Sequence, residues 1–105
     1  MLQESFTNQL TQLGRRILPK DAKLWLYGSR ARHDARPDSD WDLLILLNKD
    51  KQEIADFDNY SYPLIYLGAE AHNIVSAHLY TQKEWESMSF TPFYKNVERD
   101  KIELI

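Results

Sequence analysis

Apolar residues recur at helical spacing in the first part of the chain. Steps of three and four residues join five apolar positions, Leu2, Phe6, Leu10, Leu13 and Ile17. Such steps place side chains on one face of a helix. Pro19 ends the predicted helix, because proline lacks the backbone N–H that a helix interior needs. The apolar face of this helix is expected to cover one side of the core.

Shorter apolar runs predict strands. Residues 23–27 are rich in large apolar side chains and stop at Gly28. Residues 40–47 form an apolar run with two acids at its entrance, which is typical of a central strand. Residues 73–80 hold no acid and no helix breaker and predict a third strand. Residues 102–105 have the composition of a further edge strand.

A helix is predicted between the second and third strands. Asp50 and Glu53 have the spacing of a capping box, although aspartate replaces the usual serine or threonine. A helical stripe then continues through Phe57, Tyr60, Leu64 and Leu67. Pro63 must kink or restart this helix.

Two further helix starts follow the third strand. Thr81 and Glu84 have capping-box spacing. Thr91-Pro92 has the pattern of an N-cap followed by proline in the first turn, and predicts a helix to about Arg99. This element order predicts an α/β (α+β) fold, in which helices pack against a small mixed sheet of three to four strands.

Length and composition narrow the classes of function. Residues 1–105 are expected to form a single domain, because this length leaves no room for a second. A formal net charge of −3 makes nucleic acid an unlikely partner, since phosphate binding normally needs an excess of lysine and arginine. The sequence lacks cysteine, a signal-peptide pattern and any run near the about 20 apolar residues that span a membrane. We expect a cytoplasmic protein with no membrane partner.

Asp40 and Asp42 could converge on one cation at the start of the second strand. Successive strand side chains point to opposite faces, so the two acids share a face while Trp41 points into packing on the other. Carboxylates about 7 Å apart along a strand can reach the same hard cations. Alone, such a pair is more often a solvated strand end than a metal site.

Gly28-Ser29, at the end of the preceding strand, strengthens the case for a nucleotide site. Glycine lets the backbone approach a ligand closely, and Ser29 offers a hydroxyl and a backbone N–H to phosphate oxygens. Arg30 and Arg32 could add positive charge beside a triphosphate. Arg36 is less certain as a phosphate ligand, and a solvated basic loop explains it equally well.

The segment spanning residues 28–44 resembles the DNA polymerase beta-like nucleotidyltransferase superfamily. The signature is Gly-Ser, an intervening turn, and Asp-x-Asp on an apolar strand; here ten residues separate Ser29 from Asp40. The match is closest to the minimal nucleotidyltransferases (MNT proteins), which are often partnered with HEPN-domain toxins. The predicted element order from Leu24 to Tyr80 agrees with that fold.

This resemblance implies a nucleotidyltransferase fold and a metal-dependent reaction. Mg²⁺ or Mn²⁺ would be held by Asp40 and Asp42, the catalytic residues. A nucleoside triphosphate, expected to be ATP, would be bound by Gly28, Ser29, Arg30 and Arg32. A nucleoside monophosphate would pass to a hydroxyl of a HEPN-type protein partner, with pyrophosphate leaving, and the chain would act as its antitoxin.

Active members of the family usually place a third carboxylate on the next strand, and residues 73–81 contain none. By pattern the vacant position is Ser76. Three explanations stay open: Glu70 reaches in from the preceding helix, His78 acts as a base, or the site binds nucleotide and metal with little or no turnover.

An antitoxin or subunit acting only by binding its partner is therefore the alternative function. The aromatic residues near the C-terminal helices are candidates for its interface, at Trp85, Phe90, Phe93 and Tyr94. Core positions are the simpler explanation for Trp25, Trp41 and Tyr27. Transfer to RNA or to a small molecule is a weaker third alternative, and a homo- or hetero-oligomer is compatible with the sequence.

Overall fold

The computed structural model describes residues 5–105, so Leu2 of the predicted first helix lies outside it. In chain order the elements are α1 (Phe6–Ile17), β1 (Lys23–Tyr27), α2 (Ser29–Arg32), β2 (Trp41–Leu47), α3 (Ile54–Asp56), a π-helical turn η1 (Phe57–Ser61), α4 (Tyr62–Glu70), β3 (Val75–Thr81), α5 (Gln82–Ser87), α6 (Pro92–Asp100) and β4 (Ile102–Glu103).

The four strands form one mixed sheet in the order β3-β2-β1-β4. β1 is antiparallel to both β2 and β4, whereas β2 and β3 are parallel. Parallel neighbours need a crossover, and α3, η1 and α4 supply it. This arrangement confirms the predicted mixed sheet with helices packed against it.

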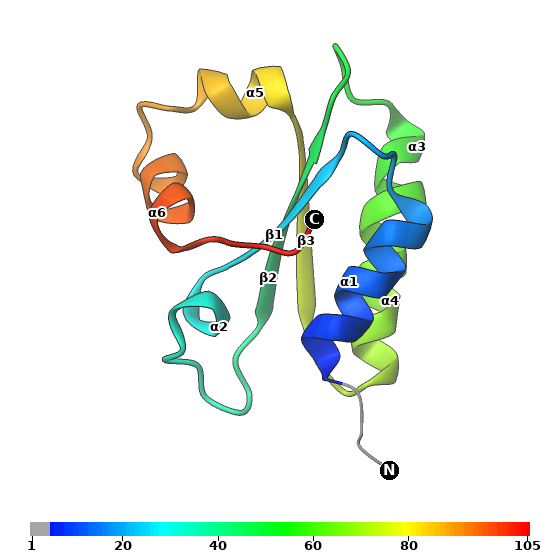
Figure 1. Cartoon of the computed structure of the whole chain (residues 1–105), viewed down its shortest axis with the longest axis vertical. Coiled ribbons are helices and arrows are strands. Elements are labelled where there is room, and N and C mark those ends of the chain that lie inside the picture. Colours follow the sequence, from blue (N-terminus) through cyan, green and yellow to red (C-terminus); the bar gives the residue numbers. More distant parts are fainter. Residues whose placement is uncertain (1–4) are drawn as a thin grey trace.

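Helices cover both faces of the sheet, with α1 and α4 on one side and α5 and α6 on the other (Figure 1). Side-chain alternation along β2 divides the core between these layers. The α1/α4 layer packs on Leu24, Leu26, Leu43, Ile45 and Ala77. The α5/α6 layer packs on Trp25, Leu44 and Leu46. Because β2 is buried on both faces, its sequence reads as a continuous apolar run.

The first helix ends where its sequence predicts, and Ser5 caps its start. Ser5 Oγ accepts a hydrogen bond of 3.1 Å from the backbone N–H of Asn8. At the other end, the N–H of Leu18 donates to the carbonyl of Gly14, and Pro19 follows. Leu10, in the middle of the predicted apolar face, is fully buried.

The crossover helix begins later than its sequence predicts. Glu53 is the N-cap, and Asp56 completes the capping box by accepting from the N–H of Glu53 at 2.7 Å. Asp56 is buried and also pairs with Lys49 at 2.7 Å, which fixes the helix start. The predicted box of Asp50 with Glu53 is wrong, since Asp50 is exposed and pairs with Lys83.

Pro63 is the second residue of α4, and the π-helical turn η1 precedes it, so the predicted restart is confirmed. The wider hydrogen-bond ring of a π turn rotates the helix face before and after it. Phe57 is consequently 48% exposed instead of belonging to the apolar stripe, whereas Leu64 is fully buried.

The two C-terminal helices, α5 and α6, have the predicted N-cap residues. Thr81 and Glu84 form a capping box, and Thr91 Oγ1 accepts from the N–H of Tyr94 at 3.1 Å. Trp85 is only 3% exposed and packs in the α5/α6 layer, so its predicted interface role is wrong, while Phe90 is 78% exposed. None of the helices described in residues 5–105 has the length and apolar character to cross a membrane.

Candidate active site

Gly28 joins β1 to α2 in a backbone conformation that only glycine adopts readily, with φ 74° and ψ −158°. Its carbonyl accepts 3.1 Å hydrogen bonds from the N–H groups of Ala31 and Arg32, which starts α2. A Cβ at position 28 would overlap Oδ2 of Asp42. The two halves of the sequence motif therefore lie in direct contact.

Asp42 occupies the middle of a row that crosses three strands. Its neighbours in register are Tyr27 on β1 and Ser76 on β3, and side chains in register share a sheet face. By alternation this is the face on which α5 and α6 pack. Asp42 is half-buried there.

Asp40 lies one residue before β2 and is exposed, although the sequence predicts it as the first strand residue. The β2–β3 ladder starts at Trp41, whose N–H donates to the carbonyl of Ile74 at 2.8 Å. Trp41 packs against Phe6 on the opposite face, with ring centroids 4.9 Å apart, as predicted. Asp40 is thus free of the ladder and placed at the rim of the sheet.

Electrostatics couple the two aspartates. Burial raises the pKa of Asp42, and the negative charge of Asp40 raises it further, while the charges of His78 and Arg32 lower it. Burial together with the charge of Asp42 and the nearby Tyr80 raises the pKa of Tyr27 to about 12. A cation between the aspartates would relieve their repulsion.

Arg30 is engaged within the loop that follows α2. Its Nη2 donates to the carbonyls of Pro37 and Ser39 at 3.1 and 2.9 Å, and its guanidinium lies 4.5 Å from the centroid of the Trp41 ring. These contacts fix the span between Ser29 and Asp40. A cavity of about 460 Å³ beside Arg30 opens on the α1 side of the sheet, away from Asp42, and is also lined by Thr7, Leu26 and Ile102.

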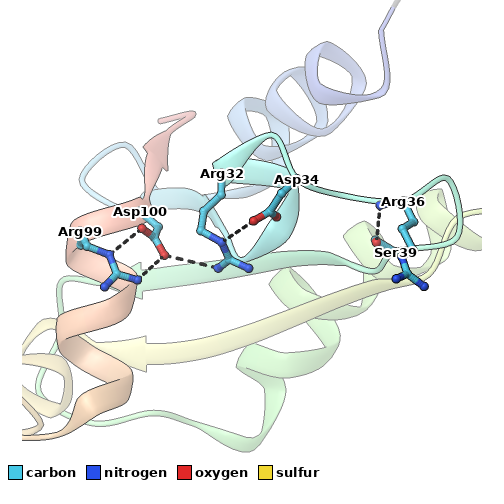
Figure 2. A network of polar contacts seen from close by, with 6 residues as sticks. All are labelled: Arg32, Asp34, Arg36, Ser39, Arg99 and Asp100. Carbon is cyan, nitrogen blue, oxygen red and sulfur yellow. Dashed lines mark hydrogen bonds and ion pairs between the residues drawn. The ribbon is translucent and has the colours of Figure 1, made fainter.

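Arg32 lies between two carboxylates (Figure 2). Its Nε donates to Asp34 at 3.2 Å and its Nη1 to Asp100 at 3.4 Å. Asp100, the last residue of α6, also accepts two hydrogen bonds from Arg99, of 2.9 and 3.0 Å. No local pattern in the sequence indicates Asp100, because it lies 68 residues from Arg32.

The register places Ser76 beside Asp42, at the position where the sequence predicts a missing acid. His78, two residues further along β3, is exposed, and its charge acts on Asp42. Glu70 lines a groove between α1 and α4 with Leu13 and Arg16, on the other side of the sheet, so it does not reach the aspartates. No group of three or more metal-binding acids, histidines or cysteines occurs in the part of the chain that the structure describes.

Two carboxylates fit a magnesium site that is completed by a substrate. Mg²⁺ is commonly held by one or two carboxylates together with phosphate oxygens and water, rather than by an all-protein cage. Asp40 and Asp42 supply such oxygen ligands, and the missing Cβ of Gly28 leaves the space into which the Asp42 carboxylate fits.

The family model of the nucleotidyltransferase domain matches residues 8–104. The chain belongs to the nucleotidyltransferase domain family. The match covers both the Gly28-Ser29 turn and the paired aspartates, and it confirms the family predicted from the sequence. No curated protein sequence matches this nucleotidyltransferase-domain chain.

Three solved structures share the fold of this nucleotidyltransferase domain. A toxin–antitoxin complex with AMP-PNP matches with TM-score 0.65 and 21% identity over 94% of this chain and 72% of that chain. A mutant of the toxin–antitoxin MntA–HpeT matches with TM-score 0.63 and 19% identity over 94% and 71%. A tri-AMPylated HEPN toxin from Shewanella oneidensis in complex with MNT antitoxin matches with TM-score 0.58 and 19% identity over 95% and 69%.

Proposed function

We propose that this protein is a metal-dependent nucleotidyltransferase that transfers a nucleoside monophosphate, most simply AMP from ATP, to a hydroxyl of a HEPN-type partner protein. The contact of the Asp42 carboxylate with Gly28, together with the electrostatic coupling of Asp42 to Asp40, carries the proposal. It brings oxygen ligands for a cation next to a turn suited to phosphate oxygens. Such a protein would act in the cytoplasm, where ATP is supplied.

Each residue of the motif has a separate role in this proposal. Asp40 and Asp42 hold Mg²⁺ or Mn²⁺, which when bound neutralises charge on the triphosphate and on the leaving oxygen. Gly28 and Ser29 present backbone and hydroxyl groups to the phosphates. Arg32 contributes positive charge, as it does at Asp42.

We assign Arg30 to the loop rather than to direct phosphate contact. Its Nη2 is committed to two carbonyl oxygens, and its guanidinium plane lies over Trp41. A guanidinium held in this way keeps Ser29 and Asp40 at a fixed separation. In this proposal Arg30 acts indirectly, by ordering the loop, whereas the sequence predicts that it contacts the nucleotide.

The transfer forms a bond between the acceptor oxygen and the α-phosphorus and breaks the bond from that phosphorus to pyrophosphate. The hydroxyl proton passes to solvent or to His78, whose imidazole lies on the same sheet face as Asp42. Ser76, in the place of a third acid, carries no charge to assist. We therefore expect slow turnover.

Likeness to the three complexes supports the choice of partner. Each is a toxin–antitoxin pair, one holds AMP-PNP, and one contains an AMPylated HEPN toxin with its MNT antitoxin. A protein hydroxyl on a HEPN toxin is therefore the acceptor we propose, with this chain as antitoxin.

A second candidate function is neutralisation by binding alone. Ser76 beside Asp42 favours it, because that position supplies no third carboxylate. In this alternative the chain covers its partner and the nucleotide site is degenerate.

Transfer of label from ATP separates the two functions. The protein is incubated with Mg²⁺, a HEPN partner and ATP labelled at the α-phosphate, beside the double variant Asp40→Asn/Asp42→Asn. Asp38→Asn, in the exposed loop before the aspartates, is the matched control. Label on the partner that disappears in the double variant and persists in the control supports the enzyme. Transfer that survives the double substitution contradicts it, and binding without any transfer by the wild type favours the second candidate.

A further inference from the structure

We propose that Asp100, at the end of α6, is a positioning residue that holds the Arg32 guanidinium in place for the triphosphate. This inference rests on the proposed function, in which Arg32 contacts the phosphates. It assigns a role in nucleotide binding to a helix that contains no part of the sequence motif. The contacts of Arg32 carry the argument (Figure 2).

Arg32 uses only part of its hydrogen-bonding capacity within the protein. Nε donates to Asp34 and Nη1 donates to Asp100, whereas Nη2 has no acceptor among residues 5–105. A guanidinium carries five N–H donors in one plane. Contacts at two of its three nitrogens thus fix that plane, and the N–H groups of Nη2 stay available to a ligand.

The two carboxylates differ in what they can fix. Asp34 is two residues from Arg32 in the same segment, and its side chain is 60% exposed, so it moves with the arginine. Asp100 belongs to α6 and its side chain is only 10% exposed. Asp100 is therefore the contact that fixes Arg32 relative to the sheet.

Asp100 is itself firmly held. Arg99 donates two hydrogen bonds to its carboxylate, and the end of α6 is closed by a 2.8 Å hydrogen bond from the Lys101 N–H to the Val97 carbonyl. Val97 is buried in the α5/α6 layer. A chain of contacts thus runs from the core through α6 to Arg32.

Charge repulsion alone and the positioning role predict opposite effects of removing Asp100 on nucleotide affinity. A carboxylate near a triphosphate repels it, so removing either Asp34 or Asp100 should tighten binding if charge alone matters. If Asp100 positions Arg32, its removal should weaken binding, because the guanidinium must then be ordered when the ligand arrives. Asp34→Asn is accordingly the matched control, because it removes the same charge and a contact with the same arginine, Arg32.

Titration calorimetry with Mg²⁺ and AMP-PNP tests the inference. We expect Asp100→Asn to raise Kd about fivefold and Arg32→Gln to raise it about tenfold, as lost charge-assisted contacts do. Asp34→Asn should leave Kd within about twofold or lower it. Asp100→Glu, which restores a carboxylate, should recover most of the loss.

A double-mutant cycle distinguishes positioning from a general effect on the fold. In the Arg32→Gln background, Asp100→Asn should cause no further loss of affinity. The melting temperature of each variant is measured in both backgrounds as a control for the fold. An equal fivefold loss without Arg32, or tighter binding by Asp100→Asn, would overturn the inference. Wild-type protein that binds no Mg²⁺–AMP-PNP at all would instead remove the proposed function on which it rests.

Discussion

The carboxylate of Asp42 lies against the α-carbon of Gly28, so closely that a methyl group at position 28 would overlap its Oδ2. The contact joins the end of β1 to the start of β2, beside the proposed metal ligands. Gly28 also has a positive φ that a larger residue adopts only with strain. Two independent requirements therefore select glycine at this one position.

Replacing Gly28 with alanine should damage both the fold and the site. The positive φ and the overlap with Asp42 should together reduce the free energy of unfolding by about 1–3 kcal/mol. The displaced carboxylate should also weaken binding of Mg²⁺ and nucleotide. Urea unfolding and calorimetric titration measure the two effects on the same protein.

Gly14→Ala is the matched control for that substitution. A Cβ there would meet the ends of two flexible side chains, Leu24 and Ile105, at 2.9 Å, and alanine is favoured in a helix. We expect nucleotide binding to stay unchanged. If Gly28→Ala is no more harmful to binding than Gly14→Ala, the close approach of Asp42 is not required.

Asp42→Asn should stabilise the metal-free protein at neutral pH. Burial and Asp40 raise the pKa of Asp42 in the folded state, so its ionised form opposes folding at pH values above the usual carboxyl pKa. Removing that charge should increase the free energy of unfolding and raise Tm. Thermal unfolding in EDTA measures this change.

With Mg²⁺ added, the wild type should melt at a higher temperature than Asp42→Asn, the reverse of the order in EDTA. The wild type gains stability by binding the cation, whereas the variant lacks one of two ligands. A variant that melts below the wild type in EDTA would show that the Asp42 charge supports the fold instead.

Arg30→Gln should loosen the loop before Asp40. The substitution removes hydrogen bonds to two carbonyl oxygens and the contact with the Trp41 ring, at a cost of about 1–2 kcal/mol in unfolding free energy. Limited proteolysis should then cut between Asp34 and Ser39 more rapidly. Arg36→Gln, at an exposed position of the same loop, should leave the cleavage rate unchanged, and equal rates for both variants would contradict this role of Arg30.

Acid should unfold the protein in part through the carboxylates that anchor its helices. Burial alone would raise the pKa of Asp56, but hydrogen bonds from the Glu53 amide and Lys49 outweigh it and lower the pKa. A hydrogen bond from Gln52, with others from Thr81, lowers the pKa of Glu84. A lowered pKa contributes stability above the usual carboxyl pKa near 4, and that contribution is lost as pH falls.

We therefore expect Tm to decline as the pH falls through about 4 and below. Asp56→Asn should lower Tm at pH 7 and flatten the decline, since its carboxylate no longer titrates. Thermal unfolding followed by far-UV circular dichroism at pH 7, 5 and 3 measures both effects. A parallel decline in the variant and the wild type would exclude Asp56 from the acid response.

Local patterns in the sequence predict most of the fold. Thr81 and Thr91 cap helices through contacts three residues away, and the alternation along β2 sets its two faces. The sequence predicts a helix start at Asp50 instead of Glu53, because Asp50 offers the spacing of a capping box. The competition is decided by burial of Asp56 and its pairing with Lys49, which a local pattern does not contain.

The sequence predicts the parts of the candidate site whose residues lie close together along the chain. It does not predict the contacts between residues that are distant in sequence. The Gly-Ser turn, Asp42 and the vacancy at Ser76 follow from the motif and strand alternation. The engagement of Arg30 with Trp41 and the pairing of Arg32 with Asp100 depend on how the loop and α6 close over the sheet.

The order β3-β2-β1-β4 leaves β3 at an open side of the sheet, one strand away from Asp42. Under the proposed function, the acceptor meets the nucleotide at an open sheet edge rather than in a deep pocket. An open edge offers a small free molecule few contacts to orient it. A hydroxyl on a protein partner is oriented by the contacts between the two protein surfaces. Substrate choice would therefore be decided by how those surfaces dock.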